Sequence, residues 1–181
     1  MKSIGLIETA SIARGIRCLD EMAKRAPVKV LLAKHVCPGR YIVLIEGEVA
    51  AVEESLKAGL AAAGDNLVDS LFLANPHPAL PASLRQSAKA QVFSPVGVIE
   101  TTAAASALLA ADAGCKAAPV DLVVVKLSIG MAGKSFVIFS GALSDVEASV
   151  AAGAGVATEH GRLLETTVLA NPDAVLEEFL A

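Results

Sequence analysis

The sequence predicts an α/β (α+β) fold of two tandem β-α-β-β-α-β units, each an open, antiparallel-type sheet with helices packed on it. Three observations predict this fold: the length of the chain, an internal repeat, and the same order of strand-like and helix-like segments in both copies. The chain has 181 residues, of which 54% are hydrophobic, so it can bury a sizeable core. Because 3% of the residues are aromatic and none is Trp, aliphatic side chains must fill that core.

The internal repeat divides the chain into two halves. Gly-Leu-Ile-Glu-Thr at 5–9 recurs as Gly-Val-Ile-Glu-Thr at 97–101, an offset of 92 residues (97 − 5). The offset grows by two in the middle of each copy and by two more near its end, where Leu-Ala-Asn-Pro at 73–76 recurs at 169–172 (169 − 73 = 96). Such a stepwise shift is what loop insertions produce in a duplicated domain.

The repeat predicts two domains, at 1–80 and 94–181, with a linker at 81–93. Three prolines gather just before and at the start of this linker, and a polar stretch follows them. Proline lacks an N–H group and resists regular structure, which suits a connector.

The first helix of each copy is predicted from apolar residues at helical spacing and from a proline just past its end, Pro27 or Pro119. The second helix is expected at 48–63 and at 144–157. The expected N-caps of the first helices are Thr9 or Ser11, and Thr101 or Thr102. The expected buried stripes in the first copy are Ile12, Ile16, Leu19 and Ala23 on one helix, and Val52, Leu56 and Leu60 on the other.

Strands are expected from runs of apolar and β-branched residues bounded by turns. The two middle strands of each copy are joined by short turns, a Pro-Gly turn in the first copy and Gly-Met-Ala-Gly at 130–133 in the second. The expected strands are 4–9, 28–36, 40–46 and 67–74, followed in the second copy by 96–101, 120–128, 134–140 and 163–170.

Composition argues against several classes of protein. A net charge of −4 and few aromatic residues disfavour nucleic acid as a partner. No run approaches the roughly 20 apolar residues of a membrane span, and no signal peptide is expected at the N-terminus. Three scattered cysteines do not make a disulfide framework, so we expect a bacterial-type cytosol with reduced thiols. The mean hydropathy of +0.60 fits either alanine richness or extensive subunit contact.

Four motifs give the sequence a family resemblance. They are Ile-Gly-Leu-Ile-Glu-Thr at 4–9, Asp-Glu-Met-Ala-Lys at 20–24, the Pro-Gly turn, and Gly-Glu-Val-Ala-Ala-Val at 47–52. With these motifs the chain resembles the shell proteins of bacterial microcompartments, and the resemblance covers both halves. Two fused copies make it similar to the tandem-domain class, whose homotrimers are pseudohexagonal tiles that assemble with other shell proteins.

The resemblance implies a central pore and contacts between tiles. In the family, the turn between the second and third strands lines the pore, and a lysine at the end of the first helix forms the tile edge. The expected pore-lining residues are Pro38, Gly39, Ile129, Gly130, Met131, Ala132 and Gly133, and the expected tile-edge residues are Lys24 and Lys116. The sequence departs from the family beside these lysines, where Pro27 and Pro119 replace a common asparagine, and in Asn-Pro-His at 75–77 and Asn-Pro-Asp at 171–173, which lack a common basic residue.

Cys37 is the candidate metal ligand. It precedes the Pro-Gly turn, where exposure is expected, and the second copy has no cysteine at the matching position. Three chains around a three-fold axis would supply three thiolates, and thiolates are the usual ligands of iron–sulfur clusters. The resemblance implies this type of cluster, one [4Fe-4S] cluster per trimer, with an outside ligand for the fourth iron. The alternative is a free thiol that only shapes the pore.

Other polar residues have plainer interpretations. His35 shares a strand face with Cys37 and fits a divalent-metal or base–nucleophile pair, but an ordinary polar strand residue is the preferred interpretation. Glu8 and Glu100 match each other and are expected to pair structurally or to stabilise a helix N-terminus. Arg40 and Lys134 either add positive charge near the pore or are solvated strand starts. We expect Cys18 and Cys115 in the core or in an interface.

The sequence therefore predicts a structural shell protein rather than an enzyme, located in a microcompartment shell in the bacterial cytoplasm. Its cluster would transfer electrons across the shell or be delivered to the lumen, with a luminal or cytosolic redox protein as a partner. Two alternatives remain: a cluster-free tile whose pore conducts a small, anionic metabolite, and a soluble ferredoxin-like, ligand-binding regulator. Neither a membrane nor nucleic acid is expected as a partner.

Overall fold

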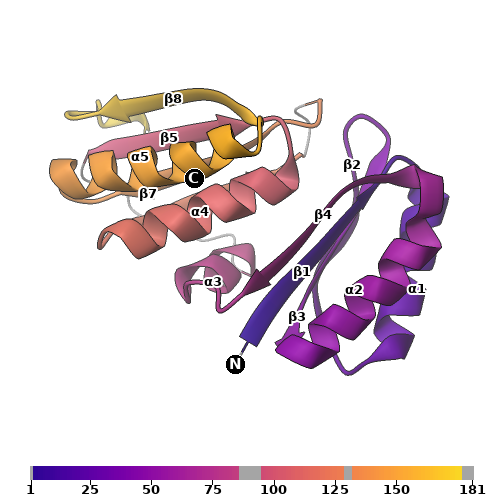
Figure 1. Cartoon of the computed structure of the whole chain (residues 1–181). Coiled ribbons are helices and arrows are strands. Elements are labelled where there is room, and N and C mark those ends of the chain that lie inside the picture. Colours follow the sequence, from indigo (N-terminus) through magenta and orange to yellow (C-terminus); the bar gives the residue numbers. More distant parts are fainter. Residues whose placement is uncertain (1, 86–94, 129–131, 177–181) are drawn as a thin grey trace. The chain divides into compact units, whose positions relative to one another are not determined.

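The structure is a computed structural model that describes residues 2–85, 95–128 and 132–176. The chain divides into two compact units, Met1–Pro76 and His77–Ala181. Each unit contains a four-stranded antiparallel sheet and two long helices in the order β-α-β-β-α-β (Figure 1). The predicted fold class is confirmed.

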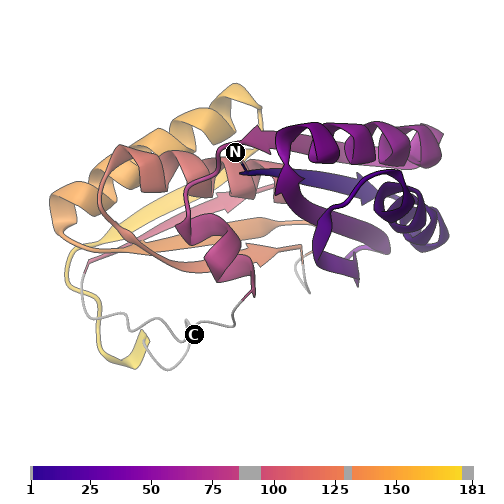
Figure 2. The same cartoon turned by 90° about the horizontal axis from the view of Figure 1, so that it is seen from below.

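The first unit has the strand order β2-β3-β1-β4, and every neighbouring pair of strands is antiparallel. Helices α1 and α2 pack against each other and lie on the sheet (Figures 1 and 2). A short 3-10 turn, η1, links α2 to the last strand. The elements are β1 Lys2–Thr9, α1 Ile12–Arg25, β2 Lys29–Val36, β3 Arg40–Glu48, α2 Val49–Ala63, η1 Gly64–Asn66 and β4 Leu67–Ala74.

The second unit repeats this arrangement with the strand order β6-β7-β5-β8. It begins with a short helix, α3, so part of the segment expected to be a linker is helical, and α3 packs on β6 and α4 of this unit. The elements are α3 Ala79–Arg85, β5 Val96–Thr101, α4 Ala104–Ala117, β6 Asp121–Leu127, β7 Ser135–Ser140, α5 Leu143–Glu159 and β8 Leu163–Leu169.

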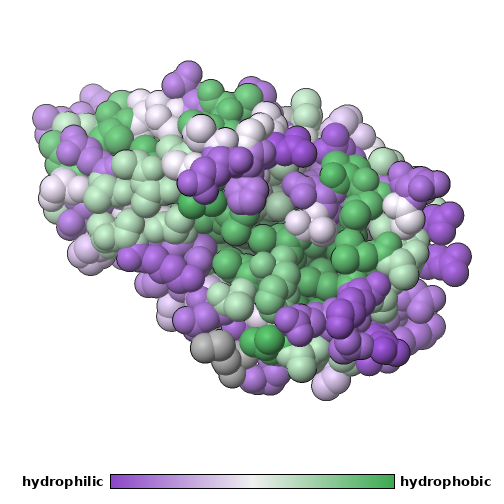
Figure 3. All heavy atoms as spheres, in the orientation of Figure 1, coloured by the Kyte–Doolittle hydropathy of each residue, from purple (hydrophilic) through white to green (hydrophobic). Residues whose placement is uncertain are grey.

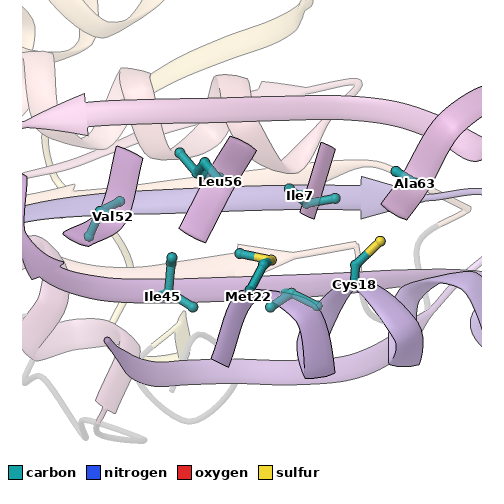
Figure 4. Close-up of a cluster of buried hydrophobic side chains, with 8 residues drawn as sticks. Ile7, Cys18, Met22, Ile45, Val52, Leu56 and Ala63 are labelled. Atoms are coloured by element: carbon teal, nitrogen blue, oxygen red, sulfur yellow. The ribbon is translucent and has the colours of Figure 1, made fainter. Parts of the chain in front are cut away.

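The core of the first unit lies between its helices and its sheet (Figure 4). Close approach of α2 to the sheet depends on glycine, since a Cβ added at Gly5 would lie 2.8 Å from a Leu56 side-chain carbon. The buried cluster consists of Ile7, Cys18, Met22, Val43, Ile45, Val52, Leu56 and Ala63. Its members are aliphatic or sulfur-containing, as the composition predicts.

The predicted buried stripe of α1 is wrong except at Leu19, which is partly buried and packs against the core. The helix buries Gly15, Cys18 and Met22, whereas Ile12 and Ile16 are 43% and 52% exposed. The reason is steric: Gly15 lies so close to Tyr41 of β3 that a Cβ would come within 2.4 Å of it. The glycine side of the helix therefore faces the sheet, and its isoleucine side faces outward. On α2, Val52 and Leu56 are buried as predicted, but Leu60 is 37% exposed.

The predicted N-cap is confirmed for α1 and wrong for α4. The Ser11 hydroxyl accepts the Arg14 N–H at 3.3 Å. The residue before α4 is Ala103, which makes no side-chain cap, and Thr101 instead donates its hydroxyl to the Ala103 carbonyl at 2.9 Å. Thr9 likewise donates its hydroxyl to the Ser11 carbonyl at 2.9 Å, so the two copies share this bond and differ in the serine cap.

Some of the apolar excess of the chain lies on its surface. Figure 3 shows hydrophobic side chains among charged ones on the face seen in Figure 1. Among the described residues, no helix is both long and apolar enough to cross a membrane. The exposed large hydrophobic residues are Ile12, Ile16, Val30, Leu60, Leu67, Phe72, Leu143, Leu164, Leu169 and Val175.

Candidate functional site

The turn between β2 and β3 carries the candidate ligand. Val36 and Arg40 form the last strand pair, so only Cys37, Pro38 and Gly39 make the turn. All three are exposed, and the bond between Cys37 and Pro38 is cis. Gly39 has a φ of +70°, a conformation that L side chains rarely adopt. The sequence prediction of an exposed Cys37 is confirmed.

A buried ion pair anchors this turn to the sheet. Arg40 Nη1 lies 3.0 Å from Glu8 Oε1, and the Glu8 side chain has no exposed surface. The pairing of β1 with β3 brings the two together, since Glu8 is opposite Ile42 in the register. The Arg40 charge is therefore compensated from within the protein, and Glu8 pairs structurally as its repeated position predicts.

The second unit has a matching but more exposed pair. Lys134 Nζ lies 3.0 Å from Glu100 Oε1, with 52% and 34% of the two side chains exposed. Lys134 and Glu100 occupy the positions that match Arg40 and Glu8 in the repeat. In both units a cation where the turn ends pairs with a carboxylate of the first strand: Arg40 is the first residue of β3, and Lys134 directly precedes β7.

Two serines close the second turn, and neither was predicted from the sequence as a functional residue. The Ser128 hydroxyl donates to the Gly133 carbonyl at 3.0 Å and lies 3.2 Å from the Ser135 hydroxyl. The Ser135 hydroxyl also accepts the Ser128 N–H at 3.1 Å, and both side chains are fully buried. The signal in the sequence was weak, because serine is common in turns and only the folded hairpin brings these two together.

The structure describes only some of the expected pore-lining residues. Ile129, Gly130 and Met131 lie outside the described residues. Ala132 and Gly133 are described, and both have positive φ angles, +50° and +91°. Whether these residues and Pro38 and Gly39 line a pore depends on how copies of the chain assemble, so this role stays a prediction.

The three cysteines fall into two classes. Cys18 has no exposed surface and donates its thiol to the Gly59 carbonyl at 3.4 Å, and burial raises its pKa. Burial, assisted by the Asp112 carboxylate, raises the pKa of the Cys115 thiol to about 11. Both are therefore core thiols, which is what the sequence predicts. Cys37 differs because its thiol is exposed and free to reach a ligand outside its own chain.

The described part of a single chain supplies no complete metal site. No group of three or more His, Cys, Asp or Glu side chains there is placed to hold a metal ion. His35, the possible neighbour of Cys37, is an exposed strand residue paired with Tyr41 in the register. A metal at Cys37 would therefore draw further ligands from other copies or from solution.

The two expected tile-edge lysines occupy equivalent places. Lys24 Nζ lies 2.6 Å from Asp20 Oδ2 in the last turns of α1, and Lys116 Nζ lies 2.6 Å from Asp112 Oδ2 in α4. The hydrogen bond to Asp20 raises the pKa of Lys24, which keeps it charged. Their proposed role in tile contacts stays a prediction.

Comparison with known proteins identifies the family. The model of the BMC domain matches residues 3–76 and 95–172. The chain is 36% identical to the bacterial microcompartment shell protein PduT of Citrobacter freundii, over 94% of this chain and 93% of that protein. It is also 36% identical over 78 residues to the carboxysome shell protein CsoS1A of Hydrogenovibrio crunogenus, which covers 41% of this chain and 81% of that protein.

A crystal structure of a microcompartment protein from Desulfitobacterium hafniense has the same fold throughout. It superposes with a TM-score of 0.93 at 44% identity and covers 98% of this chain and 99% of that one. A match to the carboxysome protein over less than half of this chain fits one unit of the duplication. The chain therefore belongs to the family of bacterial microcompartment shell proteins and carries two BMC domains in tandem.

Proposed function

We propose that this shell protein forms a homotrimeric, pseudohexagonal tile that assembles with other shell proteins and holds one [4Fe-4S] cluster at its central three-fold pore. Cys37 from each of three chains would bind the cluster. The role is structural rather than catalytic, and the cluster would serve electron transfer across the shell or be delivered to the lumen. The observation that carries the proposal is the exposed Cys37 thiol at the tip of a turn, in a chain whose two other cysteines are buried.

The donor set fits such a cluster. Iron–sulfur clusters are held by cysteine thiolates, and Cys37 offers one soft sulfur ligand on each chain. The second unit has no thiol at the matching position, so the duplicated fold itself does not require a cysteine there. Three chains would supply three sulfur ligands and leave one iron for a small thiol or water.

The residues around Cys37 would hold it in a defined place. Strands β2 and β3 pair up to Val36 and Arg40, which fixes both ends of the three-residue turn. The ion pair of Arg40 with buried Glu8 ties the start of β3 to β1. When bound, the cluster would supply one-electron chemistry, and its potential would depend on the hydrogen bonds and exposure around the sulfurs.

The same ion pairs bear on the cluster-free alternative. An anion-conducting pore would be favoured by uncompensated positive charge. Arg40 and Lys134, the cations beside the two turns, are both paired with carboxylates at 3.0 Å. This pairing favours a closed, cluster-bearing centre over a pore that attracts small anions.

The first test is iron and sulfide analysis of protein purified without oxygen. We expect about four irons and four sulfides per trimer, with a visible absorption band, and loss of all three in Cys37→Ala. Cys115→Ala is the matched control, because alanine stands at the corresponding position 23 of the first copy. It should keep the cluster.

Light scattering on the same samples tests the trimer, whose mass should be about 55 kDa, three times the 18.4 kDa of the chain. A trimer without iron, even after reconstitution, would reject the cluster and favour metabolite passage. A monomer at micromolar concentration would contradict the tile itself and favour the soluble ligand-binding regulator.

A further inference from the structure

The segment after the last strand of each unit folds in the same way in both copies. After β4, the Leu80 N–H donates to the His77 carbonyl at 3.0 Å, and after β8 the Leu176 N–H donates to the Asp173 carbonyl at 3.0 Å. In each turn the side chain of the first residue also accepts the N–H of the residue two positions later, at 3.3 and 2.9 Å. The repeat relates the two turns by the offset of 96 (173 − 77).

The first of these turns is docked on a helix of the second unit. The His77 N–H donates to Asp112 Oδ1 of α4 at 2.7 Å. Leu80 has no exposed surface, and helix α3, which begins at Ala79, packs against α4 and β6. The second carboxylate oxygen of Asp112 accepts the Lys116 ammonium at 2.6 Å, and the Asp112 side chain is only 8% exposed.

The matching helix of the first unit, α1, lacks this cover. Asp20, which corresponds to Asp112, pairs with Lys24 at the same 2.6 Å, but its side chain is 54% exposed. In the described part of the chain no other residue hydrogen-bonds to the Asp20 carboxylate. Ile16 corresponds to Leu108, and it is 52% exposed whereas Leu108 is fully buried.

The turn after β8 is exposed in a corresponding way. Val175 is 51% exposed, and Leu176, the counterpart of fully buried Leu80, is only half-buried. The described part of a single chain therefore contains one docked pair of turn and helix, together with a second turn and a second helix of the same kind that no described residue covers.

The two uncovered surfaces carry one pair of opposite charges at positions where the docked pair has none. Arg17 is exposed on α1 where α4 has Leu109 (109 − 17 = 92), and Asp173 begins the uncovered turn where the docked turn has His77. Opposite charges across an interface favour one partner and one register. The docked pair has no such ion pair, so the two replacements introduce opposite charges that the docked contact lacks.

We propose that the turn at 173–176 of one copy docks on α1 of a second copy, as the turn after β4 docks on α4. The Asp173 N–H would donate to the Asp20 carboxylate, Leu176 would cover the Ile16 side of the helix, and Arg17 would pair with Asp173. The proposal rests on the proposed homotrimer, in which each chain gives one such contact and receives one.

Disulfide trapping tests the contact. In a Cys37→Ala background, where the two remaining cysteines are buried, Ile16→Cys is combined with Leu176→Cys. Oxidation should give covalent dimers and trimers on a non-reducing gel. The control pairs Leu176→Cys with Lys57→Cys, on the exposed side of α2, and should remain monomeric on the gel.

The outcomes separate this contact from the trimer itself. The Cys37→Ala chain is first sized by light scattering. A trimer that gives no covalent ladder, or a disulfide formed within one chain, would overturn the docking and leave the homotrimer standing. A monomer would contradict both.

A charge reversal tests the same contact without cysteine. Asp173→Arg and Arg17→Asp should each weaken the trimer about 3- to 10-fold, as measured by dilution, and the double variant should restore it. If the double variant weakens the trimer by the two single effects combined, Arg17 and Asp173 do not pair.

Leu176→Asp should weaken the trimer about 10- to 100-fold while the chain stays folded by circular dichroism. An unchanged trimer would reject the contact.

Discussion

At the scale of single residues, two acid–base pairs in matching positions have different environments. Glu8 is fully buried beside an Arg40 side chain that is 29% exposed, whereas Glu100 and Lys134 are 34% and 52% exposed. A buried charge that loses its partner is costly, because water cannot replace the lost contact, whereas an exposed pair contributes little. The ion pair should therefore contribute more to stability in the first unit, where it anchors the turn that carries Cys37.

This contrast predicts different stability losses. Glu8→Ala should lower the free energy of unfolding by about 2–4 kcal/mol, since it leaves Arg40 without its carboxylate in a largely buried place. Glu100→Ala is the matched control and should cost at most about 1 kcal/mol. Urea denaturation of both variants measures the difference. Equal losses would show that the burial of Glu8 does not determine how much its ion pair contributes to the free energy of unfolding.

At the scale of elements, glycines decide which side of a helix meets the sheet. Gly15 brings α1 against Tyr41, and Gly114, one of the buried residues of α4, lies against Phe139 of β7, where an added Cβ would be 2.4 Å from the ring. A missing side chain lets the aromatic ring of the neighbouring strand fill the space. This close packing turns the isoleucines of α1 outward, against the pattern expected from hydrophobic spacing alone.

Adding one methyl group at two helical glycines tests this packing. Gly15→Ala should destabilise the protein by about 1–3 kcal/mol, because the new Cβ overlaps Tyr41. Gly155→Ala, in α5, meets open space and should stabilise it by about 0.5–1 kcal/mol through helix propensity. Thermal unfolding compares the two variants. A neutral Gly15→Ala would mean that α1 can shift outward at no cost.

At the scale of the whole molecule, the duplication gives the two lysines proposed for the tile edge different surroundings. Lys24 and Lys116 end equivalent helices with the same aspartate pairing, but their side chains are 71% and 44% exposed. A tandem protein can thus present alternating edges to its neighbours.

The proposed tile edge predicts a loss of sheets without a loss of trimers. Lys24→Ala combined with Lys116→Ala should abolish extended sheets in electron micrographs while light scattering still reports the trimer. Lys57→Ala is the matched control, because Lys57 is as exposed as Lys24 and also pairs with a nearby carboxylate. Unchanged sheets in the double variant would reject the role of the two lysines.

The repeat made most of the fold predictable. Each strand and each long helix was predicted twice at related positions, so the pattern of one copy supported that of the other. The exposed Cys37 was also predictable, because a residue before a Pro-Gly turn has few neighbours to cover it. The buried serines 128 and 135 were not, since their hydrogen bonds join residues that only the hairpin of β6 and β7 brings together.

The sequence by itself determined the fold class, the duplication and the unmatched cysteine before the Pro-Gly turn, because these depend on local patterns and on comparison of the chain with itself. Only the tertiary structure decided which face of α1 is buried, which cations are neutralised, and which of two equivalent turns is covered. These properties depend on distances between residues far apart in the chain, and local residue patterns do not set those distances.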